Sequence, residues 1–167
     1  MTEKENYHSL EEMEKILKGE TLGFLGLCRN STPYVVPVTY GYNNGKIWLH
    51  CASEGMKLEY LRANPTVCFT VGWQSGSIIR HPQGAQCKTN HDSVICFGTA
   101  RIIDNINERC NILNTFNQCL QPDAKEIRPD EVLNCLAIEI TIHQMTGRQQ
   151  RKGIEHTYWE YNFNLNK

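Results

Sequence analysis

Apolar residues recur first at helical spacing and later at the spacing of strands. Between Leu10 and Leu17 they lie three or four positions apart. Ser9 and Glu12 form a capping box ahead of this run, and Gly19 follows it. Because such a box satisfies free amides of a first helical turn, the pattern predicts a short surface helix.

From residue 22 onward the pattern is that of short strands joined by turns. Strands are predicted over 22–28 and 34–42, with the turn-prone residues 29–33 between them. The Asn-Gly pair at 44–45 supplies the positive φ angles of a type I′ turn and leads into a third strand over 47–51. These three strands are therefore expected to be consecutive and antiparallel.

The rest of the chain predicts two helices and three strands around one long loop. The helices are expected over 55–64 and 106–120, and the strands over 67–73, 94–103 and 136–142. Residues 74–92 are rich in Gly, Ser, Gln and Pro, which predicts an excursion loop. Six strands joined mainly by hairpins, with three helices, indicate a mainly β fold of the α+β class, an antiparallel barrel with helices outside.

Length, charge and motifs narrow the class of protein. At 167 residues the chain fits a single domain with a substantial core. Its 17 basic and 18 acidic residues are mixed along the sequence, which disfavours nucleic acid and membrane surfaces as partners. No apolar run is long enough to span a bilayer and no secretory signal is apparent, so a cytoplasmic protein is expected. The glycine-rich motifs of classical dinucleotide and P-loop sites are also missing.

The eight cysteines include no Cys-x-x-Cys pair, which disfavours zinc ribbons and thioredoxin-type motifs. Most of them lie among apolar neighbours, so free, buried thiols are expected. Cys87 and His91 have a spacing seen in metal sites, but too few further ligands accompany them. No metal site is predicted.

The segment from His50 to Lys57 carries the most specific chemistry. Here an apolar strand ends and a short amphipathic helix begins, with small residues and a lysine in the first turn. Free amides at a helix start, the positive end of its dipole and a lysine together favour a phosphate. An ordinary turn with a solvated lysine is the alternative at this stage.

Several segments in a fixed order resemble a known family. Residues 34–42 form a Pro-Val strand, residues 48–52 end a strand in His-x-Ala, and residues 55–57 begin a helix with Gly-x-Lys. This order is similar to that of the FMN-binding split-barrel family of pyridoxamine 5′-phosphate oxidase-like proteins, nearest to its nitroimidazole-resistance branch. The resemblance implies one six-stranded split β-barrel domain, with a core over about residues 10–147 and a C-terminal tail over 148–167.

The resemblance also implies an FMN site, whose parts these residues can supply. Ser53 and Lys57, with the amides at the helix start, would hold the phosphate, and the strand around Pro37 would run beside the flavin ring. Arg148 would place a cation near a flavin edge. The expected cofactor-binding residues are Pro37, Val38, Thr39, Tyr40, His50, Cys51, Ala52, Ser53, Met56, Lys57 and Arg148.

His50 is the expected catalytic residue. Its place beside the proposed phosphate and ring site would let it contact flavin or substrate, and an imidazole can deliver a proton near neutral pH. A histidine that is merely satisfied in the core or at the surface is the alternative.

The function implied by the resemblance is an FMN-dependent oxidoreductase, in which NAD(P)H reduces a small acceptor such as a nitroaromatic or nitroimidazole compound. A homodimer with FMN at the subunit interface is implied as well. Residues 74–76 replace the arginine-rich segment of the oxidase branch, and residues 147–151 lack its Arg-x-His-x-Arg pattern. Pyridoxamine phosphate oxidation is therefore not expected.

Two other functions stay open from the sequence. One is a flavin-binding carrier or sensor without a dedicated substrate. The other is a split barrel that binds heme, for which His50, His81, His91 and the cysteines offer axial ligands.

Overall fold

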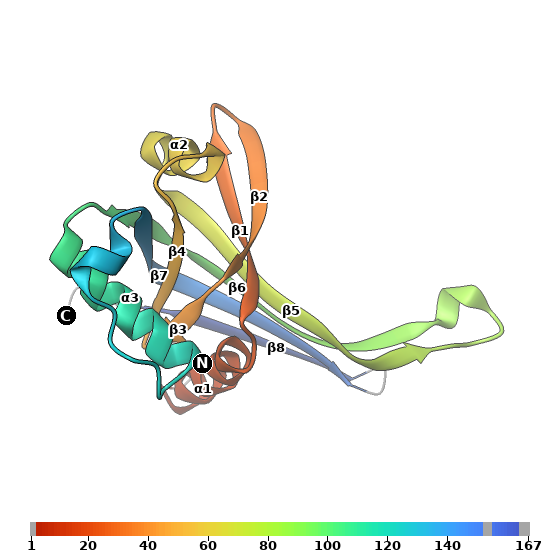
Figure 1. Ribbon diagram of the computed structural model, residues 1–167. Helices are drawn as coiled ribbons and strands as arrows, with labels where there is room; N and C mark the ends of the chain where they lie inside the picture. Colours follow the sequence, from red (N-terminus) through yellow and green to blue (C-terminus); the bar gives the residue numbers. More distant parts are fainter. Residues whose placement is uncertain (1–2, 152–154, 164–167) are drawn as a thin grey trace.

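The structure, a computed structural model, describes residues 3–151 and 155–163 (Figure 1). Three α-helices and two short 3₁₀ helices lie around one sheet. The helices are α1 (Glu3–Gly19), α2 (Met56–Ala63), η1 (Gly84–Gln86), α3 (Ile106–Leu120) and η2 (Pro129–Val132). The strands are β1 (Leu22–Arg29), β2 (Thr32–Thr39), β3 (Gly41–Asn43), β4 (Lys46–Ala52), β5 (Thr66–Ile79), β6 (Lys88–Ile103), β7 (Cys135–Arg151) and β8 (Glu155–Asn162).

All strand pairs in the sheet are antiparallel. The order is β2-β1-β5-β6-β7-β4-β3, and β8 pairs with β7. The sheet curls so that β2 lies near β4, with no ladder between the two among the described residues. Alternate side chains such as Leu25, Ile47, Leu49, Phe69 and Ile138 fill the enclosed core and are fully buried. The expected antiparallel, mainly β fold with outer helices is confirmed.

The number of strands differs from the prediction: the described residues form eight rather than six. The run predicted over 34–42 divides at Tyr40, whose amide donates to the Thr21 carbonyl at 3.1 Å instead of continuing the ladder with β1. Gly41 then pairs with Trp48, so β3 belongs to the opposite edge of the sheet. The predicted tail contains the end of β7 and the strand β8, which pairs with it. Most side chains of β8 are exposed, so its sequence has no regular alternation of apolar and polar residues from which a strand could be predicted.

The predicted loop over 74–92 is a two-stranded arm instead. β5 and β6 continue pairing beyond the body of the protein, through Ser75 opposite Asn90 and Ile79 opposite Lys88. The arm projects far from the sheet and carries η1 at its tip (Figure 1). Residues 76–88 are all exposed, so neither face of the arm has the apolar stripe by which a strand is predicted from sequence.

Helix boundaries were predicted with mixed success. α3 has the predicted bounds, and its Asn105 side chain accepts hydrogen bonds from the amides of Asn107 and Glu108, both at 3.0 Å. The capping box at Ser9 is wrong, because α1 already begins at Glu3 and Ser9 lies inside the helix.

No helix in the described part of the chain is long and apolar enough to cross a membrane.

The eight cysteines are unpaired, but most are not buried as predicted. Cys96 and Cys110 are buried, three others are half-buried, and Cys28, Cys87 and Cys119 are exposed. An apolar neighbour in sequence lies on the opposite face of a strand, so it does not report the burial of the cysteine itself.

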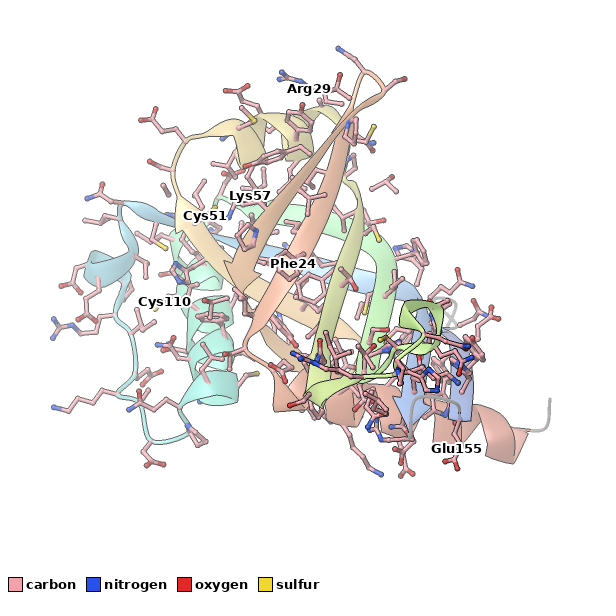
Figure 2. All side chains as sticks on the ribbon, turned by 90° about the vertical axis from the view of Figure 1, so that its right-hand side faces the viewer. Phe24, Arg29, Cys51, Lys57, Cys110 and Glu155 are labelled. Atoms are coloured by element: carbon pink, nitrogen blue, oxygen red, sulfur yellow. The ribbon has the colours of Figure 1, made fainter. Side chains whose placement is uncertain are left out.

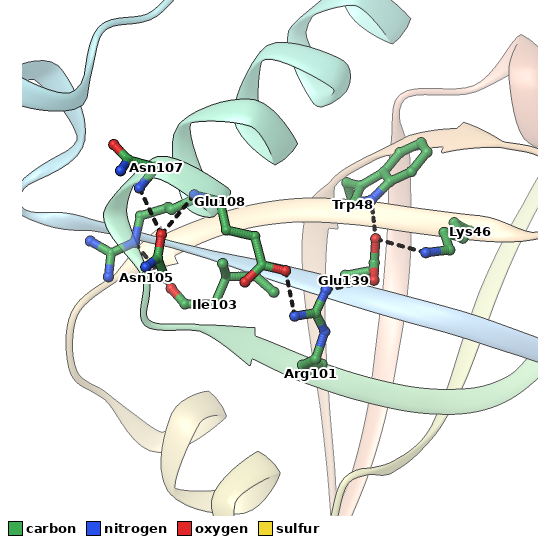
Figure 3. A network of polar contacts seen from close by, with 9 residues as sticks. Lys46, Trp48, Arg101, Ile103, Asn105, Asn107, Glu108 and Glu139 are labelled. Atoms are coloured by element: carbon green, nitrogen blue, oxygen red, sulfur yellow. Dashed lines mark hydrogen bonds and ion pairs between the residues drawn. The ribbon is translucent and has the colours of Figure 1, made fainter.

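A nearly buried carboxylate joins three strands on the face covered by α3 (Figure 3). Glu139 of β7 accepts a hydrogen bond from Trp48 Nε1 at 2.9 Å and ion pairs from Lys46 at 3.2 Å and Arg101 at 3.0 Å. Burial by itself would raise the pKa of Glu139, but these three donors together hold the pKa below its usual value. The network ties β4 and β6 to β7.

We expect Glu139→Gln to lower the free energy of unfolding by about 2 kcal/mol at neutral pH, because a charged acceptor loses its donors. The stabilisation from Glu139 is present above the unfolded pKa of a glutamate and is lost as pH falls through the lower folded pKa. The difference in unfolding free energy between the two proteins, measured with urea, should therefore begin to shrink below about pH 4.3, the ordinary pKa of a glutamate, and should vanish below the lower folded pKa. Glu108→Gln, an exposed partner of Arg101, is the matched control and should cost under about 0.5 kcal/mol. If the difference in unfolding free energy between the wild type and Glu139→Gln stayed constant down to pH 2, the stabilising role of the ionised Glu139 would be contradicted.

Candidate functional site

The junction between β4 and α2 leaves the start of a helix open. Gly55 precedes α2 with φ of 126°, a conformation that favours glycine, and no side chain caps the first turn. A Cβ placed on Gly55 would meet nothing within 4 Å. The first-turn amides therefore face space in which an anion could be bound.

Lys57 adds a positive charge to this junction. Its side chain is half-buried, and none of the ion pairs among the described residues includes it. The thiol of Cys51, the second-last residue of β4, lies close to Lys57 (Figure 2). Burial raises the pKa of Cys51, and the Lys57 cation offsets part of that rise. A lysine at a helix start, in none of the ion pairs of the described residues, fits a dianion such as a phosphate monoester.

β2 supplies a free strand edge near this junction. Its only ladder partner in the described sheet is β1, and β2 also approaches β4. Pro37 and Thr39 point outward and are exposed, whereas Val38 and Tyr40 are buried. Pro37 does lie on an edge strand, but the ladder with β1 is not interrupted there, since Pro37 pairs with Phe24 in an unbroken register.

Tyr40 has a structural role in the core. Its hydroxyl donates to the Leu17 carbonyl at 2.7 Å, and its ring packs edge-on against Phe69 with centroids 4.7 Å apart. Burial raises the pKa of Tyr40 above its ordinary value. In this chain the Tyr40 side chain therefore faces the core, and only its backbone borders the free edge.

His50 points to the opposite face of β4 from Cys51. It is exposed and its ring packs against Phe116 of α3, with centroids 5.4 Å apart. It lines a hollow of about 370 Å³ beneath α3 and the segment 121–134. Apolar side chains such as Phe116 and Val132 form the floor, and Lys125 and Glu126 contribute polar groups. This size and polarity suit a small ring compound.

Arg148 is far from the other predicted residues. Ala137 of β7 pairs with His50, and Arg148 lies eleven residues further along the strand, about 36 Å at the usual rise. Its guanidinium lies 3.3 Å from His156 Nδ1, and its Nε is buried without a hydrogen-bond partner in the described structure. Arg148 cannot reach the β4–α2 junction of its own chain.

Ten of the eleven predicted residues lie in or beside β2, β4 and the start of α2, but they do not all face the β4–α2 junction. Val38 and Tyr40 are buried in the core, and His50 points to the opposite face of β4 from Cys51, as the two-residue period of a strand indicates. Sequence reasoning missed the hollow, because its floor comes from α3 and from η2, which are distant in sequence. No cluster of three or more His, Cys, Asp or Glu suitable for a metal occurs within residues 3–151 and 155–163.

Comparison with known proteins identifies the family. A sequence model of the pyridoxamine 5′-phosphate oxidase family matches residues 9–149. The chain belongs to this family. The resemblance to pyridoxamine 5′-phosphate oxidase-like proteins, which implied a core over about residues 10–147, is confirmed.

Individual relatives of the family agree with this assignment. An uncharacterised protein of Rhizobium meliloti is 34% identical over 64 residues, which cover 38% of this chain and 41% of the relative. A solved structure of a candidate 5-nitroimidazole antibiotic resistance protein from Bacteroides thetaiotaomicron is 27% identical, with a TM-score of 0.69 over 82% of this chain and 81% of its own. An FAD-binding protein from Mesorhizobium loti is 25% identical, with a TM-score of 0.61 over 84% and 92%.

Proposed function

We propose that this protein is a flavin-dependent oxidoreductase that binds FMN and uses NAD(P)H to reduce a small aromatic acceptor. The observation that carries the proposal is the half-buried residue Lys57, in none of the ion pairs of the described residues, beside the uncapped start of α2. Membership of the pyridoxamine 5′-phosphate oxidase family and similarity to an FAD-binding protein support a flavin as the ligand. One open helix start and one lysine suit the single phosphate of FMN.

The residues of the chain would bind and position the cofactor. Lys57, the first-turn amides and the Ser53 hydroxyl would hold the phosphate, and the free edge of β2 from Pro37 to Thr39 would offer backbone groups to the ring. When bound, the flavin supplies electron transfer between a reduced nicotinamide and an acceptor. The protein supplies position, a largely apolar wall and a means of moving protons.

The hollow beside His50 would bind the acceptor. Phe116 and Val132 provide apolar contact for a ring, and Asn117 and Lys125 provide donors for a polar substituent such as a nitro group. His50 would then deliver a proton to the acceptor as it is reduced. Similarity to the candidate 5-nitroimidazole resistance protein supports a nitroheterocycle as the acceptor class.

A homodimer would complete the site. The outer face of β2, β1, β5 and β6 exposes adjacent apolar side chains, among them Val35 at 62% and Phe24 at 42% (Figure 2). Leu22, Ile95 and Phe97 continue this apolar face. An apolar face of this kind favours a second copy as its cover. Since Arg148 cannot reach Lys57 of its own chain, it would serve the flavin of the partner subunit.

One measurement tests the proposal directly. The purified protein should show the absorbance of oxidised flavin, and acid should release a compound with the mass of FMN rather than of FAD. NADH or NADPH should bleach this absorbance, and a nitroimidazole should restore it without oxygen. A colourless protein that takes up no added FMN would overturn the proposal. A flavin spectrum unchanged by either nicotinamide would favour a carrier or sensor, and a Soret band without flavin would favour heme.

A further inference from the structure

The outer part of the arm, residues 76–88, projects away from the body of the protein, and each of its residues is exposed (Figure 1). Ile78 and Ile79 are 50% and 41% exposed there. A two-stranded ribbon alone is marginally stable in water. Its outer part, residues 76–88, carries Arg80 and Lys88 and no carboxylate. The arm therefore presents apolar and basic groups to a partner.

The rim of the hollow beside His50 has the complementary character. The segment 121–134 carries four carboxylates against two cations, and Glu126 and Glu131 lie at the hollow itself. Leu133 of the same segment is 62% exposed. Apolar side chains beneath α3 and acidic groups on the rim together match the isoleucines and the two cations of the arm.

The arm and the hollow lie at opposite ends of β7. The hollow is lined by Cys135 at the start of β7, whereas Arg148 near its end pairs with Ser93 at the base of the arm. In Figure 1 the arm leaves the body on the side away from α3 and η2. The arm therefore cannot fold onto the hollow of its own chain.

A second copy removes this geometric obstacle. Two chains packed through the outer apolar face, with the two-fold axis across the strands, lie antiparallel, so the arm end of each faces the α3 end of the other. Because Arg148 pairs with Ser93 at the base of the arm, a rotation that carried Arg148 toward the Lys57 end of a second copy would carry the arm in the same direction, toward the α3 end of that copy.

We propose that the arm of one protomer closes over the acceptor-binding hollow beside His50 in a second copy of the chain. The isoleucines at its tip cover the apolar opening, and Arg80 and Lys88 face the carboxylates of the segment 121–134. The arm thereby excludes water from the site and limits the size of the acceptor. This inference rests on the proposed function, since it assigns a roof to the same site.

A photo-cross-linking experiment tests the contact without any activity measurement. Ile79→p-benzoylphenylalanine in the full chain should cross-link, after irradiation of a mixture with isotopically heavy protein, to residues 113–135 of the other copy. The reciprocal variant Leu133→p-benzoylphenylalanine should cross-link to the arm of the other copy. Cross-links within one chain, cross-links to another region, or none would each overturn the inference.

A mixed dimer tests the role of the arm in catalysis. In an arm-less variant, Asn-Gly replaces residues 76–89 between Ser75 and Asn90, which the structure pairs as neighbouring strand positions. At low acceptor concentration its turnover should fall about tenfold, because the covered apolar opening is lost. The mixed dimer with a Lys57→Met chain, separated from both homodimers after co-expression, should have about half of the wild-type turnover per dimer, since the flavin-deficient copy lends its arm to the one intact site.

The two possible failures are distinguishable. If the mixed dimer is no faster than the arm-less homodimer, the arm does not act on the second copy and the inference fails, although flavin binding stands. If Lys57→Met chains hold FMN as tightly as the wild type, the proposed phosphate site itself is wrong. Flavin content of each homodimer, measured first by absorbance, separates these outcomes.

Discussion

Lys57→Met lowers the affinity for FMN by roughly 10- to 150-fold, corresponding to about 1.5–3 kcal/mol for a charged hydrogen bond to phosphate. The loss is expected because this ammonium is the cation that lies half-buried at the open start of α2. Titration of the apoprotein with FMN, followed by quenching of flavin fluorescence, measures it. Riboflavin, which lacks the phosphate, should bind the wild type and the variant with equal affinity.

Two variants control this prediction. Lys15→Met removes an exposed lysine paired with Glu12 and should leave FMN affinity unchanged. Lys57→Arg keeps the charge and should retain part of the affinity. An unchanged FMN affinity in Lys57→Met would remove the β4–α2 junction as the phosphate site.

His50→Gln should lower the rate of acceptor reduction by about 100-fold or more, the usual contribution of a general acid. Its flavin content should stay at the wild-type level, because His50 points to the opposite face of β4 from Cys51 and Lys57. Stopped-flow measurements should show a slower acceptor-dependent step and an unchanged nicotinamide-dependent step. The pH dependence of the acceptor-dependent step should disappear with the imidazole.

Asn117→Ala is the matched control for this variant, since Asn117 lines the same hollow without an ionisable group. It should alter the acceptor-dependent rate by about tenfold at most, the effect of losing one neutral hydrogen bond of about 0.5–1.5 kcal/mol. Loss of flavin in His50→Gln would instead assign His50 to cofactor binding. An unaltered rate and pH profile would exclude it from the chemistry.

Local sequence patterns predicted the elements that place large apolar side chains at regular intervals in the core. The helical spacing of α3 and the alternation from Leu136 to Ile142 both gave correct elements. In β7 the residues from Leu136 to Ile140 are buried on both faces, but only one of these faces carries the large aliphatic side chains that make the alternation visible. The same reasoning failed for the arm and for β8. Both are exposed on much of their surface, so backbone hydrogen bonds hold them in place without a matching pattern of side chains.

The candidate site also has one part that the sequence could predict and one part that it could not. The β4–α2 junction is a continuous segment, and its glycine, lysine and preceding strand could be recognised together. The hollow combines β4 with α3 and η2, and only the folded sheet brings these elements into contact. Arg148 was predicted by its neighbours in sequence, but the distance along β7 separates it from Lys57 in a way that no motif could indicate.

The place of β7 in the chain bears on how the protein is made. β7 joins β6, β4 and β8, and its contacts with β4 link residues as far apart as Trp48 and Glu139. On the ribosome, the hairpins β1–β2 and β5–β6 can form early, but the sheet cannot close until β7 has emerged. Until then the edges of β4 and β6 lie open to other chains. Slow emergence of residues 135–151 therefore prolongs the time in which the nascent chain can aggregate.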